Sequence, residues 1–176
     1  MRVGFISDTH GRHGDLGNEW RKGAWGDTPW DRLCSCDVVV HCGDCTPDGK
    51  AYHARDFLDW FSRSFDGRKV LVPGNHDFCF DPAWSATTEE GRRRHWRRVA
   101  TEPVSRLMSA YPTVTLLSDS GAEVAGLRFW GSGVTPWFHD WALNRHRGAH
   151  IRKHWDLVPE GTDVLVTHGP PAGVLD

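Results

Sequence analysis

The 176-residue sequence lacks any apolar run close to the roughly 20 residues that a membrane-spanning helix requires. It also lacks an excess of either charge, because 21 Lys and Arg stand against 23 Asp and Glu, for a formal net charge of -2. This balance gives no electrostatic reason to expect nucleic acid or an anionic membrane as a partner. The first residues show no basic region, long apolar stretch and cleavage site of a signal peptide, so we expect a cytoplasmic protein.

Repeats, low-complexity segments and long linkers are also missing, so residues 1–176 are predicted to form a single domain. Cysteine is scarce and odd in number, at 5. Four of the five lie close together, at Cys34, Cys36, Cys42 and Cys45. A structural zinc site is one interpretation, but a single residue between the first two departs from the usual ligand spacing. We favour the alternative, in which these thiols are reduced and pack as small hydrophobic groups.

Short apolar runs at residues 3–6, 38–40, 70–72 and 164–166 are rich in β-branched residues and predict four strands. Because they are apolar at every position, we expect them to be covered on both faces. Residues 52–65 carry apolar side chains at helical spacing, so the second and third runs predict a strand–helix–strand crossover. Further expectations are a strand at 114–117, a hairpin at 123–130, and helices within 87–110 and before Pro159. The sequence thus predicts an α/β domain with a mixed sheet or a pair of sheets.

Each of the four predicted strands ends in polar residues beside a glycine. The four endings are Asp8-Thr9-His10, Gly43-Asp44, Gly74-Asn75-His76-Asp77 and His168-Gly169. Ligands bind at the carboxyl edge of strands in open α/β sheets, and glycine permits the tight turns needed there. The side chains together offer oxygen and nitrogen ligands without a required thiolate, which suits Mn²⁺, Fe or Zn²⁺. Two such cations about 3.5–4 Å apart suit in-line displacement at phosphorus.

In this order, the four endings resemble the motifs of the calcineurin-like metallophosphoesterase superfamily. The stretches "SDTHGRH", "PGNHDFCFD", "WGSGVTPWFHDWALNR" and "VPEGTDVLVTHGPP" are similar to its metallophosphoesterase-domain-containing subgroup, described from animal brain, over nearly the whole chain. The resemblance implies an α/β sandwich of two mixed β-sheets flanked by helices. It also implies a hydrolase acting on phosphodiesters, with cyclic nucleotides among the candidate substrates, through two divalent metal ions.

The resemblance also implies a role for each matching residue. Asp8 and His10 would hold the first metal, Asp44 would bridge both, and Asn75 and His168 would hold the second. His76 would act as the catalytic acid or bind the phosphate. Catalysis would then be attack by a metal-bridging hydroxide, with Mn²⁺ the favoured metal and Asp44 and His76 the catalytic residues. Trp137, Phe138 and Asn144 match a stretch that would shape the pocket, although packing of a long loop explains them equally well.

The chain departs from the family pattern because the final Gly-His-x-His motif does not follow His168. We therefore expect a C-terminally incomplete fold that lacks its last strands, as a fragment or as a short form whose site another subunit completes. His146, His150 or His154 would be improbable substitutes, because they lie on a predicted helix. The alternative function is a non-catalytic nucleotide- or phosphate-binding module. We interpret the arginine-rich residues 92–98 as a solvated helix face rather than as a nucleic-acid contact.

Overall fold

The structure is a computed structural model that describes residues 1–19, 27–84, 103–171 and 173. The arginine-rich residues 92–98, and the helix predicted for them, lie outside the described residues. The described helices are η1 (His13–Asp15), α1 (Leu16–Glu19), α2 (Pro29–Cys34), α3 (Ala51–Ser64), η2 (Phe78–Phe80), η3 (Pro82–Trp84), α5 (Val104–Ser109) and α6 (Ala149–Trp155). The described strands are β1 (Val3–Ile6), β2 (Val38–His41), β3 (Arg68–Leu71), β4 (Val114–Leu116), β5 (Ser120–Val124), β6 (Leu127–Ser132), β7 (Thr135–Pro136), β8 (Asn144–Arg145) and β9 (Val164–Thr167).

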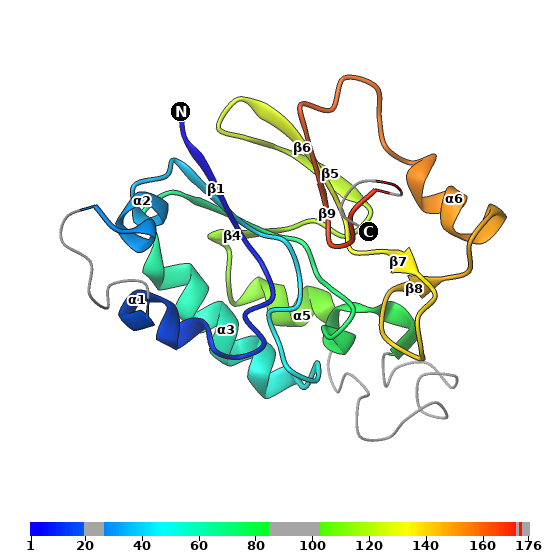
Figure 1. The fold of residues 1–176 in the computed structure, drawn as a ribbon, viewed down its shortest axis with the longest axis horizontal. Helices are drawn as coiled ribbons and strands as arrows, with labels where there is room; N and C mark the ends of the chain where they lie inside the picture. The colour runs from blue at the N-terminus through cyan, green and yellow to red at the C-terminus, as the bar shows by residue number, and fades with distance from the viewer. Residues whose placement is uncertain (20–26, 85–102, 172, 174–176) are drawn as a thin grey trace.

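The first sheet has the order β1-β2-β3-β4, and its strands are all parallel. Its register aligns the strand ends, because Ile6 pairs with His41 and His41 pairs with Leu71. The helix α3 connects β2 to β3, which confirms the predicted crossover. In Figure 1 the helices α1, α2 and α3 lie on one side of this sheet and β5, β6 and β9 on the other.

The central strand β2 shows how one apolar run serves two layers. Val39 belongs to the core beneath α3, whereas Val38 and Val40 belong to the core between the two sheets. On the helix side, α3 contributes Phe57 and Phe61, both with no exposed surface. Each such fully buried side chain stabilises the fold by about 1.5–3 kcal/mol relative to exposure. The helical spacing of these residues therefore fixes α3 against the sheet.

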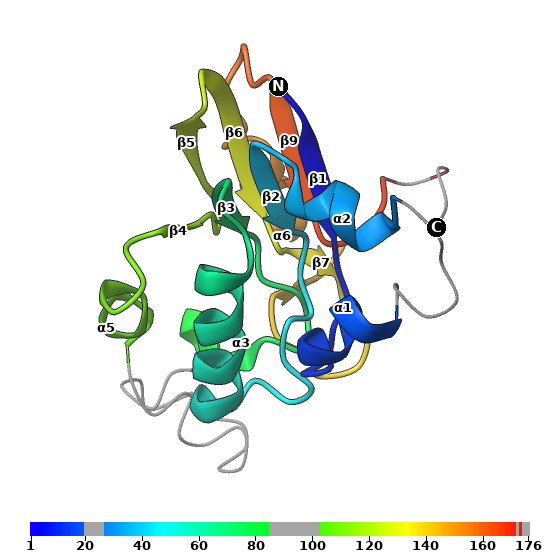
Figure 2. The same cartoon turned by 90° about the vertical axis from the view of Figure 1, so that its left-hand side faces the viewer.

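The second sheet has the order β5-β6-β9, with β5 antiparallel and β9 parallel to β6. The predicted hairpin is confirmed, and its two turn residues Ala125 and Gly126 have φ of 51° and 80°. Phe129 and Val166 of this sheet pack against the valines of β2 and β3. The expected sandwich is therefore present, with a parallel four-stranded sheet, a mixed three-stranded sheet and flanking helices (Figure 2).

The expectation that all four apolar runs are covered on both faces is wrong for two of them. Phe5 of β1 is 54% exposed and Leu165 of β9 is 53% exposed, whereas every residue of β2 is buried. The reason lies in strand order, since β1 and β9 are edge strands of their sheets and β2 is central. None of the helices among the described residues combines the length and apolar character of a membrane span.

All five cysteines are free thiols, and Cys45 and Cys79 are buried. Burial, together with the nearby Asp8 carboxylate, raises the pKa of Cys42 to about 11. The groups of potential metal ligands that the described residues bring together contain no cysteine. Cys45 belongs to a hydrophobic cluster, and Cys34, Cys36 and Cys42 pack against such clusters, which agrees with the packing interpretation.

Candidate metal centre

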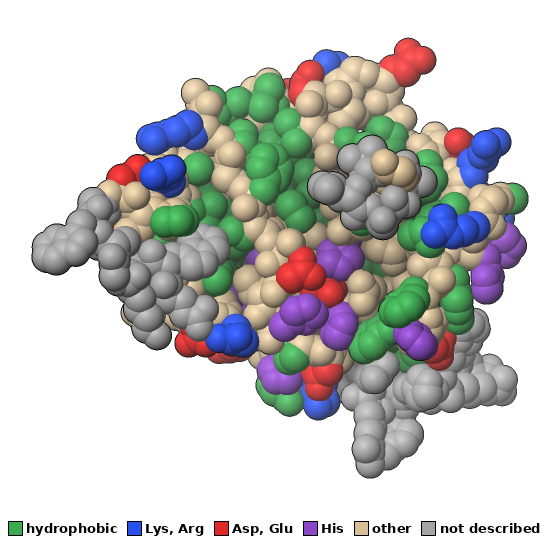
Figure 3. Space-filling model, in the orientation of Figure 1, with side chains coloured by type: hydrophobic (Ala, Val, Ile, Leu, Met, Phe, Trp, Pro, Cys, Tyr) green, Lys and Arg blue, Asp and Glu red, His purple; other side chains and the backbone are tan. Residues whose placement is uncertain are grey.

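The predicted ligands come together from loops that follow strands of both sheets. Asp8 and His10 follow β1, Asp44 follows β2, Asn75 and His76 follow β3, and His168 follows β9. The aligned register of β1, β2 and β3 brings the first three loops to one edge. The fourth loop, which carries His168, belongs to the second sheet and follows Thr167 of β9, the residue that pairs with Ser132 at the end of β6. Figure 3 shows the resulting cluster of acidic and histidine side chains on the surface.

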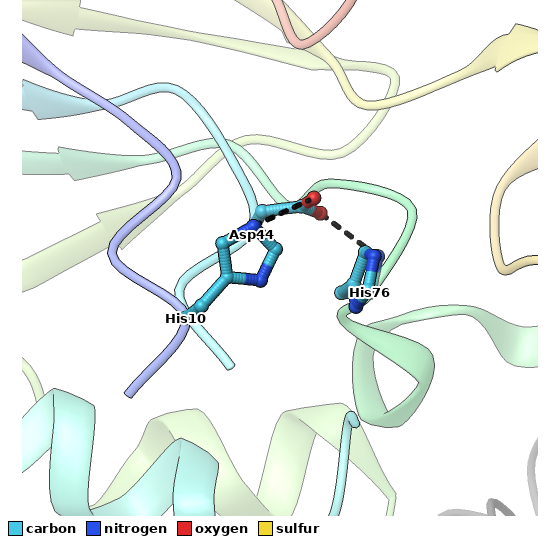
Figure 4. Close-up of side chains that lie close together, drawn as sticks. All are labelled: His10, Asp44 and His76. Atoms are coloured by element: carbon cyan, nitrogen blue, oxygen red, sulfur yellow. Dashed lines mark hydrogen bonds and ion pairs between the residues drawn. The ribbon is translucent and has the colours of Figure 1, made fainter. Parts of the chain in front are cut away.

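Asp44 lies at the centre of this cluster. Its Oδ2 lies 3.7 Å from His10 Nε2, and its Oδ1 lies 3.4 Å from His168 Nε2. The backbone N–H of His76 donates a hydrogen bond of 2.8 Å to Asp44 Oδ1 (Figure 4). Burial alone would raise the pKa of Asp44, but His168 and the His76 backbone lower it. Asp44 is therefore a buried carboxylate that stays ionised and faces histidines on both sides.

His168 is enclosed by oxygen atoms. Its Nδ1 donates to the Cys42 carbonyl at 2.9 Å, while its Nε2 lies 3.1 Å from Asn75 Oδ1 and 3.4 Å from Asp44 Oδ1. Burial alone would lower the pKa of His168, but Asp44 and the Cys42 carbonyl raise it to about 9. The oxygens near Nε2 stabilise a positive charge at this position, and either a proton on His168 or a metal ion would supply it.

His76 is held on three sides. Its Nδ1 donates to the Pro47 carbonyl at 2.9 Å. The other ring nitrogen, Nε2, is therefore the one that can bind a metal ion or exchange a proton with a substrate. The ring makes a T-shaped contact with His10 at a centroid distance of 4.6 Å. One face stacks on Trp141 at 4.1 Å with an interplanar angle of 28°. The imidazole therefore has a fixed tautomer and orientation beside Asp44.

The backbone at this edge is strained in a way that marks functional sites. Among the described non-glycine residues, seven have positive φ, and three of these are Asp8 (56°), His10 (44°) and Asp44 (55°). Left-handed backbone costs an ordinary L-residue about 1–2 kcal/mol, so it persists only where the surroundings impose it. All three strained residues are predicted ligands, so the strain supports a ligand-binding role for the cluster.

Two buried polar residues that the sequence analysis did not single out support the loops. Asp77 accepts hydrogen bonds from the backbone of Cys45, Thr46 and Gly74 and from the Thr46 hydroxyl. It thereby joins the loops after β2 and β3, and burial raises its pKa despite these bonds. His41, fully buried beneath the site, lies 3.1 Å from the Thr9 hydroxyl.

The signal for Asp77 was present in the Gly-Asn-His-Asp stretch, as a carboxylate directly after a predicted ligand loop. His41 gave no comparable signal, because a single histidine at a strand end does not reveal its burial.

The loop at residues 137–143 borders the cluster. Trp141 stacks on His76, and the Ala142 N–H donates to the Asn75 carbonyl at 3.1 Å. Asn144 is 6% exposed and its amide donates to the Phe138 carbonyl at 2.6 Å. The structure therefore gives Asn144 the role of holding this loop, while Trp137 and Phe138 stand on its exposed side.

The potential metal-ligating atoms form two groups that share one residue. One group is His10, Asp44 and His76; the other is Asp8, Asp44 and His168. The resemblance instead paired Asp8 with His10 and left His76 outside the ligand set. In the structure His10 Nε2 also lies 3.8 Å from Asp8 Oδ1, so the loop after β1 serves both groups. Carboxylates, imidazoles and the Asn75 amide fit a divalent cation such as Mn²⁺, Fe²⁺ or Zn²⁺.

Histidines outside the cluster have other partners. His154 Nδ1 lies 2.7 Å from Asp119 Oδ2, and the Arg145 guanidinium donates to its Nε2. His146 stacks on Trp137 at 4.7 Å. Neither these two nor His150 belongs to the ligand groups of the described residues.

Comparison with known proteins identifies the family of this chain. A family model described as calcineurin-like phosphoesterase matches residues 1–176. Human metallophosphoesterase domain-containing protein 1 is 34% identical over 143 residues, which is 80% of this chain and 44% of that protein. UPF0046 protein K07C11.7 of Caenorhabditis elegans is 33% identical over 141 residues, covering 80% of this chain and 46% of that protein. This chain thus spans less than half the length of these curated relatives.

A solved crystal structure is similar in fold. It superimposes with a TM-score of 0.59 and 16% sequence identity, covering 98% of this chain and 70% of the other. At this identity the likeness shows the fold alone. It agrees with the sandwich described above.

Proposed function

Because this chain belongs to the calcineurin-like phosphoesterase family, we propose that it is a metal-dependent phosphoesterase that hydrolyses phosphodiesters. The observation that carries the proposal is the position of Asp44, a buried carboxylate shared by two groups of metal-ligating side chains. Cyclic nucleotides are among the candidate substrates, and residues 1–176 act as one catalytic domain. Mn²⁺ is the proposed metal, held as a pair.

Two divalent ions at this site would supply Lewis-acid activation of the phosphate and of the attacking water. The chain's own part is to fix the ligands and to orient the substrate. Asp44 is the proposed shared ligand, and Asp8, His10, Asn75 and His168 are the other proposed ligands, so that His76 of the first group is left for the substrate. His76 keeps Nε2 beside Asp44, where the ring binds a phosphate oxygen and, when protonated, passes a proton to the leaving oxygen.

Metal content and turnover, measured together, test this proposal. The chain is reconstituted with Mn²⁺, analysed for metal, and assayed with bis(p-nitrophenyl) phosphate. We expect two ions per chain and turnover that a chelator abolishes, with both lost in Asp44→Asn. Asp66→Asn is the matched control, since Asp66 is an exposed carboxylate just before β3, at the opposite end of the sheet. Equal metal content and turnover in Asp44→Asn would contradict the proposal.

A non-catalytic nucleotide- or phosphate-binding module is the second candidate. It is favoured by the small number of ligands, because each of the two groups among the described residues has three members and Asp44 belongs to both. Tight phosphate binding without turnover under Mn²⁺, Fe²⁺ or Zn²⁺ would select this candidate. Turnover that is abolished by chelator would eliminate it.

A further inference from the structure

The loop at residues 137–143 presents large aromatic side chains to solvent. Trp137 is 45% exposed and Phe138 is 66% exposed. One face of the Trp137 indole is covered by His146, at 4.7 Å with an interplanar angle of 14°. The indole is therefore packed against His146 on one face and retains solvent-exposed surface. Exposed aromatic surface carries a free-energy cost in water, so neighbouring exposed rings on one loop suggest a binding role.

This loop has a fixed shape that its own sequence does not favour. His139 and Leu143 both have positive φ, at 52° and 58°. Two buried polar side chains impose this shape: Asn144 donates to the Phe138 carbonyl, and Asp81 accepts the Leu143 N–H at 2.7 Å. Asp81 is 1% exposed and Asn144 is 6% exposed. Because buried polar groups and left-handed backbone are costly, the loop is built to hold its aromatic residues in place.

The same loop is joined directly to the candidate metal centre. Trp141 stacks on His76, and Ala142 donates to the Asn75 carbonyl. In Figure 3 hydrophobic side chains lie immediately beside the acidic and histidine cluster. The loop that carries Trp137 and Phe138 therefore adjoins the place where the cluster would hold a phosphate.

We propose that Trp137 and Phe138 form a stacking subsite for a planar aromatic group carried on one ester oxygen of the substrate. This inference rests on the proposed function, because it takes the metal centre as the phosphate site. In this proposal the aromatic ring of the substrate stacks on the face of Trp137 opposite His146, and the exposed Phe138 is the neighbouring apolar side chain in the loop. The subsite adds substrate selectivity to a metal centre that by itself distinguishes only phosphate groups.

Binding, rather than turnover, tests the subsite. The Mn²⁺-reconstituted chain is titrated with adenosine 5′-monophosphate and with ribose 5-phosphate, which differ only in the base. Stacking of one base on an aromatic side chain corresponds to roughly a 5- to 150-fold gain in affinity. We expect at least a 10-fold preference for the nucleotide, which is about 1.4 kcal/mol.

The variants assign this preference to the loop. Trp137→Ala and Phe138→Ala should reduce the preference toward unity and leave the dissociation constant of ribose 5-phosphate unchanged. Trp137→Tyr, which keeps a ring, should restore most of it. Tyr52→Ala is the control, because Tyr52 is 60% exposed but lies on α3, outside the loop. An equal loss for both compounds in the alanine variants would indicate a structural defect and overturn the subsite.

The outcomes separate this inference from the proposed function. Hydrolysis of bis(p-nitrophenyl) phosphate without any nucleotide preference would overturn the subsite and leave the phosphoesterase in place. A nucleotide preference lost in Trp137→Ala, without any turnover, would support the subsite in a non-catalytic binding module. If neither compound binds, the subsite is wrong, and exposed Trp137 and Phe138 then become candidates for a protein contact.

Discussion

At the scale of single residues, His41 shows how a buried titratable group supports the site from below. It has no exposed surface, and its Nε2 faces the Thr9 hydroxyl, between the candidate ligands Asp8 and His10 along the chain. Burial, aided by the nearby His168, lowers the pKa of His41 to about 3. The imidazole is therefore neutral in the folded protein over the whole physiological range.

This depressed pKa makes stability depend on pH. Between pH 6.5 and about 3 the unfolded chain binds a proton at His41 that the folded chain refuses, so the free energy of unfolding falls as pH falls through this window. One proton corresponds to a slope of at most about 1.4 kcal/mol per pH unit. We expect the free energy of unfolding of His41→Gln to change less with pH than that of the wild type. Urea unfolding followed by tryptophan fluorescence at pH 7, 6 and 5 measures this.

The control for this slope keeps the imidazole. Thr9→Val removes the hydroxyl partner but leaves His41 to titrate, so it should lower stability at every pH and retain the wild-type slope. Parallel pH curves for wild type and His41→Gln would show that another group causes the dependence.

At the scale of elements, the turns after the strands depend on glycines with no room for a side chain. A methyl group on Gly74 would overlap Asp44 and would come within 2.8 Å of His168 Cε1. We therefore expect Gly74→Ala to displace the loops after β2 and β9 and to destabilise the protein by about 1–3 kcal/mol.

Chemical denaturation compares this variant with Gly14→Ala. A methyl group on Gly14 would meet nothing within 4 Å, so its effect should stay within about 0.5 kcal/mol. Wild-type stability in Gly74→Ala would mean that the loops after β2 and β3 can separate without cost.

Comparison of sequence and structure at this scale shows what local patterns encode. The valine runs predicted β2 and β3 because β-branched apolar residues suit a strand buried on both faces, and the helical spacing of Phe57 and Phe61 predicted α3. The same rule failed for Phe5 and Leu165, because whether a strand is central or at an edge depends on the order of strands in the sheet. Sequence neighbours do not determine that order.

The candidate site divides in the same way. The sequence placed Asp8, Asp44 and His168 at strand ends. The parallel register of β1 and β2 brings the first two ends together, whereas His168 reaches Asp44 from the mixed sheet. Two contacts of His76 could not be predicted, because local sequence patterns do not encode them: the contact with His10, and the stack on Trp141, which lies 65 positions further along the chain. The two-residue strands β7 and β8 were also not predicted, since so short a pattern has no periodicity.

At the scale of the whole molecule, the cluster joins the two sheets. Asp8, Asp44 and Asn75 extend from the parallel sheet, whereas His168 extends from β9 of the mixed sheet. The His168 Nδ1–H bond to the Cys42 carbonyl already crosses this boundary. A divalent ion held by Asp8, Asp44 and His168 would add coordination bonds across it, and those bonds require the folded arrangement of both sheets.

Metal binding should therefore stabilise the entire fold. A ligand that binds only the folded state adds about 2.7 kcal/mol at 100 times its dissociation constant. For a chain of this size that is a rise in melting temperature of roughly 5–10 °C. We expect Mn²⁺ to raise the melting temperature by this amount, chelator to reverse the rise, and Asp44→Asn to abolish it, because asparagine keeps the shape of the side chain but loses the shared negative charge. Asp66→Asn should retain the rise. An equal rise in Asp44→Asn would place the stabilising ion elsewhere, and a melting temperature that ignores Mn²⁺ would mean that the cluster does not bind this ion.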